Sequence, residues 1–392
     1  MSRISLQTLR RYAVERSLFA PTTLQRALER LQFVQADPIR SPARAQDLTL
    51  RHRVRNYRAG DLDRHYAALE LCEDFFVNYG FVTRTVHELM HPRAGVTAWS
   101  SMRWSAARRR LVDALLAFVR ERGTVHPREV DAHFAHGSVV NYWGGSSSAT
   151  TRLLDQMHYR GLLRVSGRDA GTRLYAVREG AAQDRPKLDI DARRARMDAL
   201  VDVVIGVYAP LPARNLSVVV RRLRYGVPQW RGDLKAALRR ARDRLGHARI
   251  GKVDWYWPAA EQVSPGEPEK RVRLLAPFDP LVWDRARFET FWGWAYRFEA
   301  YTPPKKRKLG YYALPLLWRD EVVGWGNLTV RQGELHAAIG YVKGRPPRER
   351  AFRAALDEEI ARMRDFLGLT GSAEFSSPGA GGGSGRGTAA RR

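Results

Sequence analysis

The chain has 392 residues, which predicts two to four structural units rather than a single core. Its 67 Lys and Arg residues against 41 Asp and Glu residues give a formal net charge of +26, which favours a polyanionic partner: nucleic acid first, an anionic membrane surface second. The single cysteine, Cys72, excludes an intrachain disulfide and a zinc site built from several cysteines, and it is typical of a reducing compartment.

Residues 1–100 are expected to form a helical unit that opens with helices over 5–16 and 22–33. The first twenty residues alternate charged and apolar side chains, so we expect no secretion signal. The longest apolar stretch, 201–211, is too short to span a bilayer. A cytoplasmic, nucleoid-associated protein without a membrane partner is therefore predicted.

Residues 101–184 carry the clearest local pattern. Apolar periodicity and flanking Gly and Pro residues predict three helices and then a hairpin, over 104–122, 126–134, 149–160, 162–166 and 172–177. This order is typical of a winged helix, whose third helix enters the major groove and whose wing contacts phosphate or the minor groove. Arg164, Arg168 and Arg173 lie on the predicted wing and are predicted DNA contacts. A purely structural or protein-binding winged helix is the alternative.

Residues 185–262 fit the same order, with helices over 190–207, 213–225 and 230–245 and a strand over 248–257. From Arg221 to Lys252 the sequence has eleven basic residues and two acidic ones. A solvated helical face usually carries both signs, so this excess favours contact with phosphate.

The composition changes after Pro268, where aromatic-rich runs predict five short strands, over 274–282, 295–301, 311–318, 321–329 and 334–341. A helix over 348–367 and a disordered tail rich in Gly and Ser over 371–392 follow. The predicted fold class is α+β. It consists of three tandem winged-helix units (1–100, 101–184 and 185–262), then a small β-barrel plus a C-terminal helix (263–370).

A polar pair follows the second predicted helix. Pro38 favours an extended backbone at Asp37, and residues i and i+2 of an extended run point the same way. Gln35 and Asp37 would therefore present an amide and a carboxylate together. Taken alone, polar residues in this position form turns more often than they catalyse.

The residues around this pair resemble the signature region of AlkZ-like DNA glycosylases. The matching positions are Gln35-Ala36-Asp37, Ala43-Arg44, Leu48, Leu50, Arg53, Asn56-Tyr57, Pro277-Phe278-Asp279-Pro280 and the stretch from Tyr296 to Leu317. The Gln-x-Asp form is similar to the YcaQ-type branch, which unhooks interstrand crosslinks. The resemblance implies three tandem winged helices around a positively charged concavity, plus a β-barrel. It implies catalytic roles for Gln35 and Asp37, within a DNA-binding region.

In this signature region Arg44 and Arg53 are the predicted DNA-binding residues. Two stretches depart from the family pattern. Val77-Asn78-Tyr79 stands where YcaQ-type members have His-Glu-Ala, and Val323-Gly324-Trp325-Gly326-Asn327 stands where the family has Val-Gly-Arg before an acidic residue.

The implied chemistry suits these residue types. A purine alkylated at N7 already carries positive charge, so it leaves without a general acid. An ionised Asp37 can stabilise the cationic sugar and act as general base, while Gln35 positions the water. The prediction is a monofunctional DNA glycosylase of DNA repair that hydrolyses the N-glycosidic bond of N7-alkylated purines, with interstrand crosslinks as further candidate substrates.

This enzyme is expected to act as a monomer on double-stranded DNA containing alkylated or crosslinked bases, with neither a metal nor another cofactor. A non-catalytic winged-helix protein, such as a transcription regulator, is the alternative from another class. A regulator would prefer one operator sequence, whereas a repair enzyme would bind most duplexes similarly and weaken steeply with salt.

Three other groups of residues have structural interpretations. Five histidines lack an evident set of acidic partners, so surface or capping roles are favoured over a metal site: His87, His91, His126, His133 and His136. Trp283, Trp292 and Trp294 are expected in the barrel core rather than as platforms for bases. Residues 303–308 are interpreted as a phosphate-facing turn beside a strand.

Overall fold

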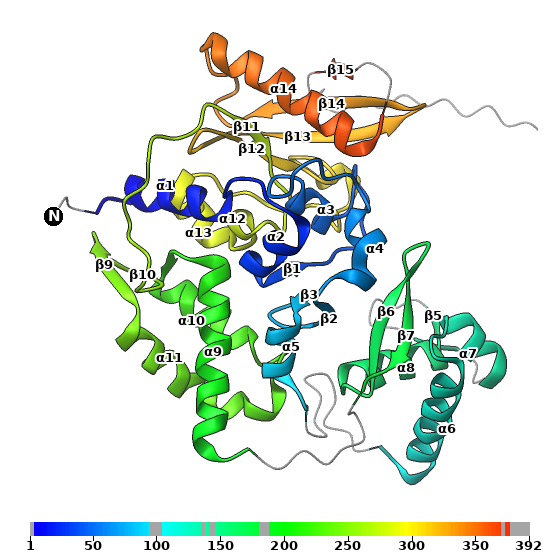
Figure 1. The fold of residues 1–392 in the computed structure, drawn as a ribbon. Helices are drawn as coiled ribbons and strands as arrows, with labels where there is room; N and C mark the ends of the chain where they lie inside the picture. The colour runs from blue at the N-terminus through cyan, green and yellow to red at the C-terminus, as the bar shows by residue number, and fades with distance from the viewer. Residues whose placement is uncertain are drawn as a thin grey trace, which may run out of the picture.

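The computed structural model describes residues 4–93, 104–134, 138–140, 146–179, 188–369 and 373–376. These residues form a mixed structure of helices and several small, mostly antiparallel sheets (Figure 1). The predicted α+β class is confirmed at this level. Within the described residues, no helix combines the length and the hydropathy that crossing a bilayer requires.

The N-terminal part, residues 4–93, alternates short helices with a three-stranded sheet of order β1-β3-β2. Its elements are α1 (Leu6–Ser17), α2 (Leu24–Leu31), β1 (Phe33–Gln35), α3 (Ala45–Leu50), α4 (Asp61–His65), η1 (Tyr66–Ala68), β2 (Leu71–Phe75), β3 (Tyr79–Thr83) and α5 (Arg84–Met90). Ser5 and Thr8 form a capping box that starts α1. Gln32 adopts a left-handed conformation that ends α2 at Leu31, two residues before the predicted end of the helix, and β1 begins at Phe33.

Residues 104–179 show the predicted order of three helices and a hairpin. The elements are α6 (Ala106–Arg122), α7 (Pro127–Phe134), β4 (Ser138–Val140), β5 (Ser146–Ser148), α8 (Ala149–Tyr159), β6 (Leu163–Asp169) and β7 (Thr172–Val177). The hairpin turn is shorter than the predicted 167–171, because Ala170 and Gly171 both have positive φ and close a two-residue turn. This part has a hydrophobic core of its own, with Leu115 and Leu153 among its fully buried residues.

Residues 188–257 contain a second set of three helices with a sheet of order β8-β10-β9. The elements are α9 (Ile190–Tyr208), β8 (Leu211–Pro212), α10 (Ala213–Arg222), η2 (Pro228–Asp233), α11 (Leu234–Arg244), β9 (Gly246–Ile250) and β10 (Val253–Trp257). The single strand predicted over 248–257 is wrong. Gly251 has a φ of +61° and reverses the chain, so this segment is a hairpin.

The C-terminal part forms one five-stranded sheet in sequence order, covered by a long helix. Its elements are β11 (Val272–Leu274), α12 (Pro280–Trp283), α13 (Arg285–Trp292), η3 (Pro304–Lys306), β12 (Leu314–Trp318), β13 (Glu321–Arg331), β14 (Glu334–Tyr341), α14 (Arg350–Leu367) and β15 (Ala373–Ser376). The last three predicted strands and the C-terminal helix are confirmed. β15 pairs with β14 inside the predicted disordered tail, and the prediction for 377–392 lies outside the described residues.

Two predicted strands in this part are wrong. The run 274–282 becomes helix α12 from Pro280 onward, because Asp279 accepts a hydrogen bond from the Leu281 N–H and caps the helix. The run 295–301 contains no strand residue.

The two larger cores are built from segments far apart in the sequence. One joins α1, α9 and α13 through Tyr12, Val204 and Phe288. The other joins α2 to the C-terminal sheet and α14, which Figure 1 shows on one side of that sheet. The N-terminal part therefore packs against both the third predicted unit and the C-terminal part, which fixes its loops in place.

Candidate active site

Gln35 is the last residue of β1, directly opposite Gly80 of β3. A Cβ atom on Gly80 would lie 2.3 Å from the Val34 carbonyl oxygen and 2.9 Å from the Gln35 Cα. Only glycine therefore allows β3 to lie this close to β1. This close packing fixes the main chain of Gln35. The pairing with β3 continues one residue further, because Ala36 N–H donates to the Tyr79 carbonyl at 3.1 Å.

The side chain of Gln35 is held by an indole that is 248 residues away in the sequence. Trp283 Nε1–H donates to Gln35 Oε1 at 2.8 Å. An indole N–H can only donate, so this contact fixes the orientation of the amide, with its NH₂ group facing away from Trp283. The Trp283 ring packs at a tilt of 32° against Tyr208, with ring centroids 4.8 Å apart, and the Arg222 guanidinium lies 5.0 Å from the centroid of its ring. Sequence reasoning placed Trp283 in a core and missed this role.

Asp37 follows two residues later and is 9% exposed. Burial raises the pKa of its carboxyl above the ordinary value of 3.8, and the hydrogen bond from Ile39 N–H, at 2.9 Å to Oδ1, partly opposes that increase. Its own N–H donates to Gln46 Oε1 at 3.3 Å. Among the described residues, no Arg, Lys or His forms an ion pair with Asp37, and Oδ2 accepts no hydrogen bond. Asp37 is therefore a near-buried carboxylate whose second oxygen is uncommitted within the described chain.

Arg53 does not lie on the surface. Its side chain is 0% exposed and pairs with Asp279, also 0% exposed, through contacts of 2.8 and 3.0 Å. It also donates to the carbonyls of Ser17 and Thr49 at 2.8 and 2.7 Å. The prediction that Arg53 contacts DNA is wrong, because its guanidinium is enclosed and fully engaged in the interior. Since Asp279 caps α12, this pair positions the helix that carries Trp283.

Arg44 precedes α3 and pairs with Asp63. Its side chain is 10% exposed, and the tip of the β6–β7 hairpin lies against it: a Cβ on Gly171 would be 2.4 Å from Arg44 Nη2. The predicted wing of the second unit therefore reaches the loop that follows Gln35 and Asp37.

The three predicted wing arginines have different surroundings. Arg168 pairs with Glu73 of β2 and Arg173 with Asp155 at 2.8 Å, whereas Arg164 is exposed. Arg168 thus ties the hairpin to the sheet that carries Gln35, a structural role that the sequence did not reveal. The predicted contacts of these residues with DNA stay predictions.

A family model described as DNA glycosylase AlkZ-like matches residues 28–366. The chain belongs to the AlkZ-like DNA glycosylase family. The predicted enzyme class and its place in DNA repair are confirmed, and the alternative of a transcription regulator is not favoured.

Among solved structures, the AlkZ-like chain is similar to the Streptomyces sahachiroi DNA glycosylase AlkZ, with a TM-score of 0.58 and 16% sequence identity. The similarity covers 95% of this chain and 100% of that one. At this identity the match establishes a shared fold.

Both departures from the family pattern have structural roles in this AlkZ-like chain. Tyr79 donates its O–H to Glu73 at 2.8 Å, and Arg173 lies over its ring at 5.2 Å, so Tyr79 helps to hold the β6–β7 hairpin. Asn327 Nδ2 donates to the Leu309 carbonyl at 2.7 Å and so supports the loop before β12. Trp325 stacks on Trp294, with ring centroids 5.7 Å apart.

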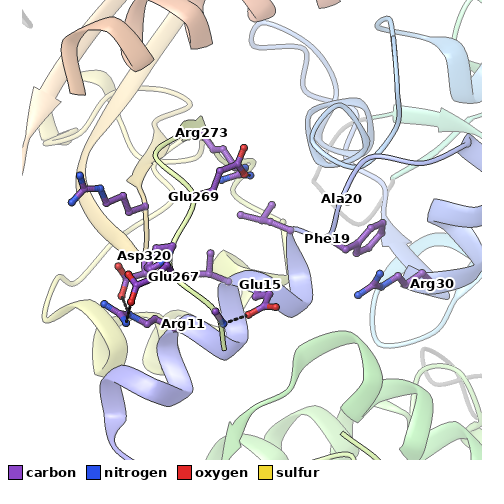
Figure 2. Close-up of a pocket in the computed structure, with 14 residues that line it drawn as sticks. Arg11, Glu15, Phe19, Ala20, Arg30, Glu267, Glu269, Arg273 and Asp320 are labelled. Atoms are coloured by element: carbon purple, nitrogen blue, oxygen red, sulfur yellow. Dashed lines mark hydrogen bonds and ion pairs between the residues drawn. The ribbon is translucent and has the colours of Figure 1, made fainter. Parts of the chain in front are cut away.

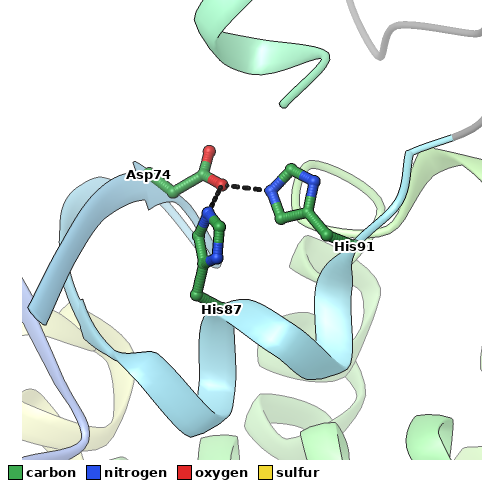
Figure 3. A group of neighbouring side chains, drawn as sticks. All are labelled: Asp74, His87 and His91. Carbon is green, nitrogen blue, oxygen red and sulfur yellow. Dashed lines mark hydrogen bonds and ion pairs between the residues drawn. The ribbon is translucent and has the colours of Figure 1, made fainter. Parts of the chain in front are cut away.

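Asp74, His87 and His91 form a buried cluster that the sequence reasoning missed (Figure 3). Their ligand atoms lie within 4.8 Å of one another, a spacing that a metal ion could use. His91 Nε2 is 2.7 Å from Asp74, and Arg93 donates to the other oxygen of that carboxylate at 2.8 Å. Burial lowers the pKa of both histidines, which keeps the rings neutral.

Arg93 also donates to the carbonyls of Tyr159 and Gly226, at 2.8 and 2.6 Å. The cluster thus joins the N-terminal part to both helical units that follow, and the Arg93 charge opposes a second cation there. We therefore assign the cluster a structural role at this junction.

Neither of two described pockets supplies the candidate site. One, of about 350 Å³, lies between α1 and the segment 266–273 and has charges of both signs (Figure 2). These are largely paired: Arg11 Nε is 3.2 Å from Asp320, and Gly266 N–H donates to Glu15 at 3.1 Å. The other, of about 420 Å³, lies beside Gln32 and Thr83. Gln35 and Asp37 line neither.

Proposed function

We propose that this chain hydrolyses the N-glycosidic bond of N7-alkylated purines in double-stranded DNA, with Gln35 and Asp37 as catalytic residues. The observation that carries the proposal is an oriented amide that lies two residues before an uncommitted carboxylate in the chain. Trp283 occupies Gln35 Oε1 and leaves the NH₂ group to donate, while Asp37 keeps one oxygen without a partner among the described residues.

The reaction balances with these groups alone. The bond between C1′ and N9 breaks, and its electron pair neutralises the cationic alkylpurine, which therefore leaves without being protonated. The negative charge of Asp37 stabilises the cationic sugar that remains. A water, held by the Gln35 NH₂ group through its oxygen, attacks C1′ and gives its proton to Asp37. The product is an abasic site and a free base, the outcome of a monofunctional glycosylase.

The proposal also includes the domain organisation around the site. The order of three helices and a hairpin in residues 106–177 supports a winged-helix unit, and 1–100 and 185–262 are proposed as two more. The sheet of 263–370 is proposed as the family's β-barrel. The positively charged concavity, the YcaQ-type branch, crosslink unhooking, nucleoid association and the monomeric state remain parts of the proposal.

Base release from alkylated DNA tests this function. Purified protein is incubated with N7-methylated duplex DNA and, separately, with duplex treated with a nitrogen mustard, and the released bases are identified by mass spectrometry. We expect free 7-methylguanine, abasic sites and unbroken strands. Release no faster than in protein-free DNA would refute the proposed substrate class. If crosslinked strands stayed joined, the substrate class would be restricted to simple adducts.

Replacing Trp283 with Phe is expected to slow base release about fivefold, because loss of one neutral hydrogen bond is worth about 1 kcal/mol and frees the Gln35 amide to rotate. The aromatic packing on Tyr208 is retained, so DNA affinity and thermal stability should change little. Trp292→Phe is the matched control, since it removes a 2.9 Å hydrogen bond to the Asp320 carbonyl without touching Gln35. Equal rates for the two variants would contradict the orienting role of Trp283.

A further inference from the structure

Residues 301–311, here called the basic–aromatic loop, expose cations and aromatic rings on one segment. Lys305, Lys306 and Lys308 are exposed, as are Tyr301 at 68% and Tyr311 at 43%. The loop has no acidic residue, and none of its lysines forms an ion pair with any described residue. A surface that serves only solubility usually carries both signs and few large rings. This surface instead suits an anionic partner with flat, stackable groups.

The loop is held in one conformation by two side chains. Glu299, 6% exposed, accepts hydrogen bonds from the backbone N–H groups of Lys308, Leu309 and Gly310, at 2.8, 2.7 and 3.3 Å. Asn327 binds the Leu309 carbonyl at 2.7 Å and packs so tightly on Gly310, whose φ is +115°, that a Cβ there would lie 2.3 Å from Asn327 Oδ1. The exposed cations and rings therefore project from a preorganised frame, which reduces the entropy lost on binding.

The loop is also stabilised from within. Arg307 Nε–H donates to the Thr302 carbonyl at 2.8 Å, and its guanidinium lies 5.0 Å from the ring of Tyr311. These contacts hold the two ends of the loop together while Lys305 and Lys306 remain exposed.

The aromatic end of the loop lies near the candidate active site. The Tyr301 ring meets Phe298 edge-on with centroids 6.1 Å apart, and Phe298 meets Tyr312 at 5.2 Å. Tyr312 lies in a hydrophobic core cluster against which Phe298 and also Ala36 and Ile39, the residues around Asp37, are packed. Burial raises the pKa of both tyrosines, and the negative charge of Asp37 adds to that increase. A DNA strand with its damaged sugar at Asp37 would pass beside Tyr301.

We propose that the basic–aromatic loop binds the strand that carries the lesion, with Lys305 and Lys306 on its phosphates and Tyr301 stacked against the nucleotide next to the damaged one. The location beside the lesion rests on the proposed role of Asp37. Lysines bind phosphate as point charges, and aromatic rings stack on bases of any sequence, which is the recognition that a repair enzyme needs at varied sites.

The lysines are tested by the salt dependence of DNA binding. Full-length Asp37→Asn protein, whose base release is expected to be strongly slowed, is titrated into a fluorescein-labelled duplex containing one tetrahydrofuran abasic analogue and into the undamaged duplex. With Lys305→Ala and Lys306→Ala together, we expect affinity for both duplexes to fall about tenfold and the slope of log K against log salt to flatten by about 2. The control pair is Lys270→Ala with Lys343→Ala, two exposed lysines outside the loop. A loop variant with the slope and affinity of the control pair would overturn the proposal.

The tyrosine is tested by selectivity for the damaged duplex. Tyr301→Ala is expected to weaken binding to the abasic duplex about tenfold while leaving the undamaged duplex nearly unchanged, and Tyr301→Phe should restore the preference because it keeps the ring. An equal effect on both duplexes, or none, would overturn the stacking role. These measurements do not depend on base release. If the wild-type protein releases no base but the loop variants bind DNA weakly, only the proposed function is refuted. If the wild-type protein releases base but the loop variants bind DNA as strongly as the unaltered loop, only the loop proposal is refuted.

Discussion

Replacing Asp37 with Asn is expected to slow base release by about 10²–10⁴-fold, the usual contribution of a positioned general base. Asparagine has the same shape and can still accept the hydrogen bond from Ile39 N–H, so the loop should keep its conformation. It cannot carry the negative charge that stabilises the sugar cation, and it cannot take the proton from water. The measurement is single-turnover release of 7-methylguanine, with DNA affinity followed in parallel by anisotropy.

Asp47→Asn is the matched control, because Asp47 is also buried and its pKa is also raised by burial. Its contacts are structural: Tyr57 O–H and Gly60 N–H donate to it at 2.8 and 3.0 Å. This change should lower stability and leave the rate per folded molecule unchanged. If Asp37→Asn released base at the wild-type rate, Asp37 would have no part in the mechanism.

The pH profile gives a second measure of the same residue. Only the ionised carboxylate can act as base, so the rate should fall as pH falls through the pKa of Asp37. Burial raises that pKa, which places the fall above pH 3.8, the ordinary value for an aspartate. The residual activity of Asp37→Asn should not show this fall in rate at low pH. If the rate fell in the same way in both proteins, the fall would belong to the titration of another group.

Local signals account for the parts of the fold that the sequence predicted well. The apolar pattern placed α1 to within one residue, and Gly123 marked the end of α6. An apolar run between turn residues marked β14 over Glu334–Tyr341 without error. The run 274–282 failed because an apolar stretch of this length suits a buried strand or a short helix equally. Asp279 and Pro280, which cap and begin α12, decide between them, and that signal was overlooked.

The candidate site was also predicted only in part. Gln35 and Asp37 are neighbours in the chain, so their spacing and the family resemblance pointed to them. The groups that position them come from the far end of the sequence, Trp283 for Gln35 and Asp279 for Arg53, and no periodicity relates residues more than two hundred positions apart. Similarly, His87 lies in α5 and His91 directly follows it, but only the fold brings Asp74 to them.

Replacing Arg53 with Met is expected to lower the free energy of unfolding by about 3–5 kcal/mol, the usual effect of removing one partner from a buried ion pair. Asp279 would keep its negative charge at 0% exposure with no cation, and the carbonyls of Ser17 and Thr49 would lose their donor. The measurement is the denaturant midpoint and slope of full-length protein.

Arg55→Met supplies the control, since Arg55 is exposed two residues away and has the same charge. It should cost less than about 0.5 kcal/mol in stability, as surface changes usually do. The comparison also distinguishes the buried structural role of Arg53 from the DNA contact that its enclosure excludes. A phosphate contact would weaken DNA binding and leave the unfolding midpoint in place. A buried tie between α3 and α12 would shift the midpoint strongly and, because α12 carries Trp283, would also slow base release in the molecules that remain folded.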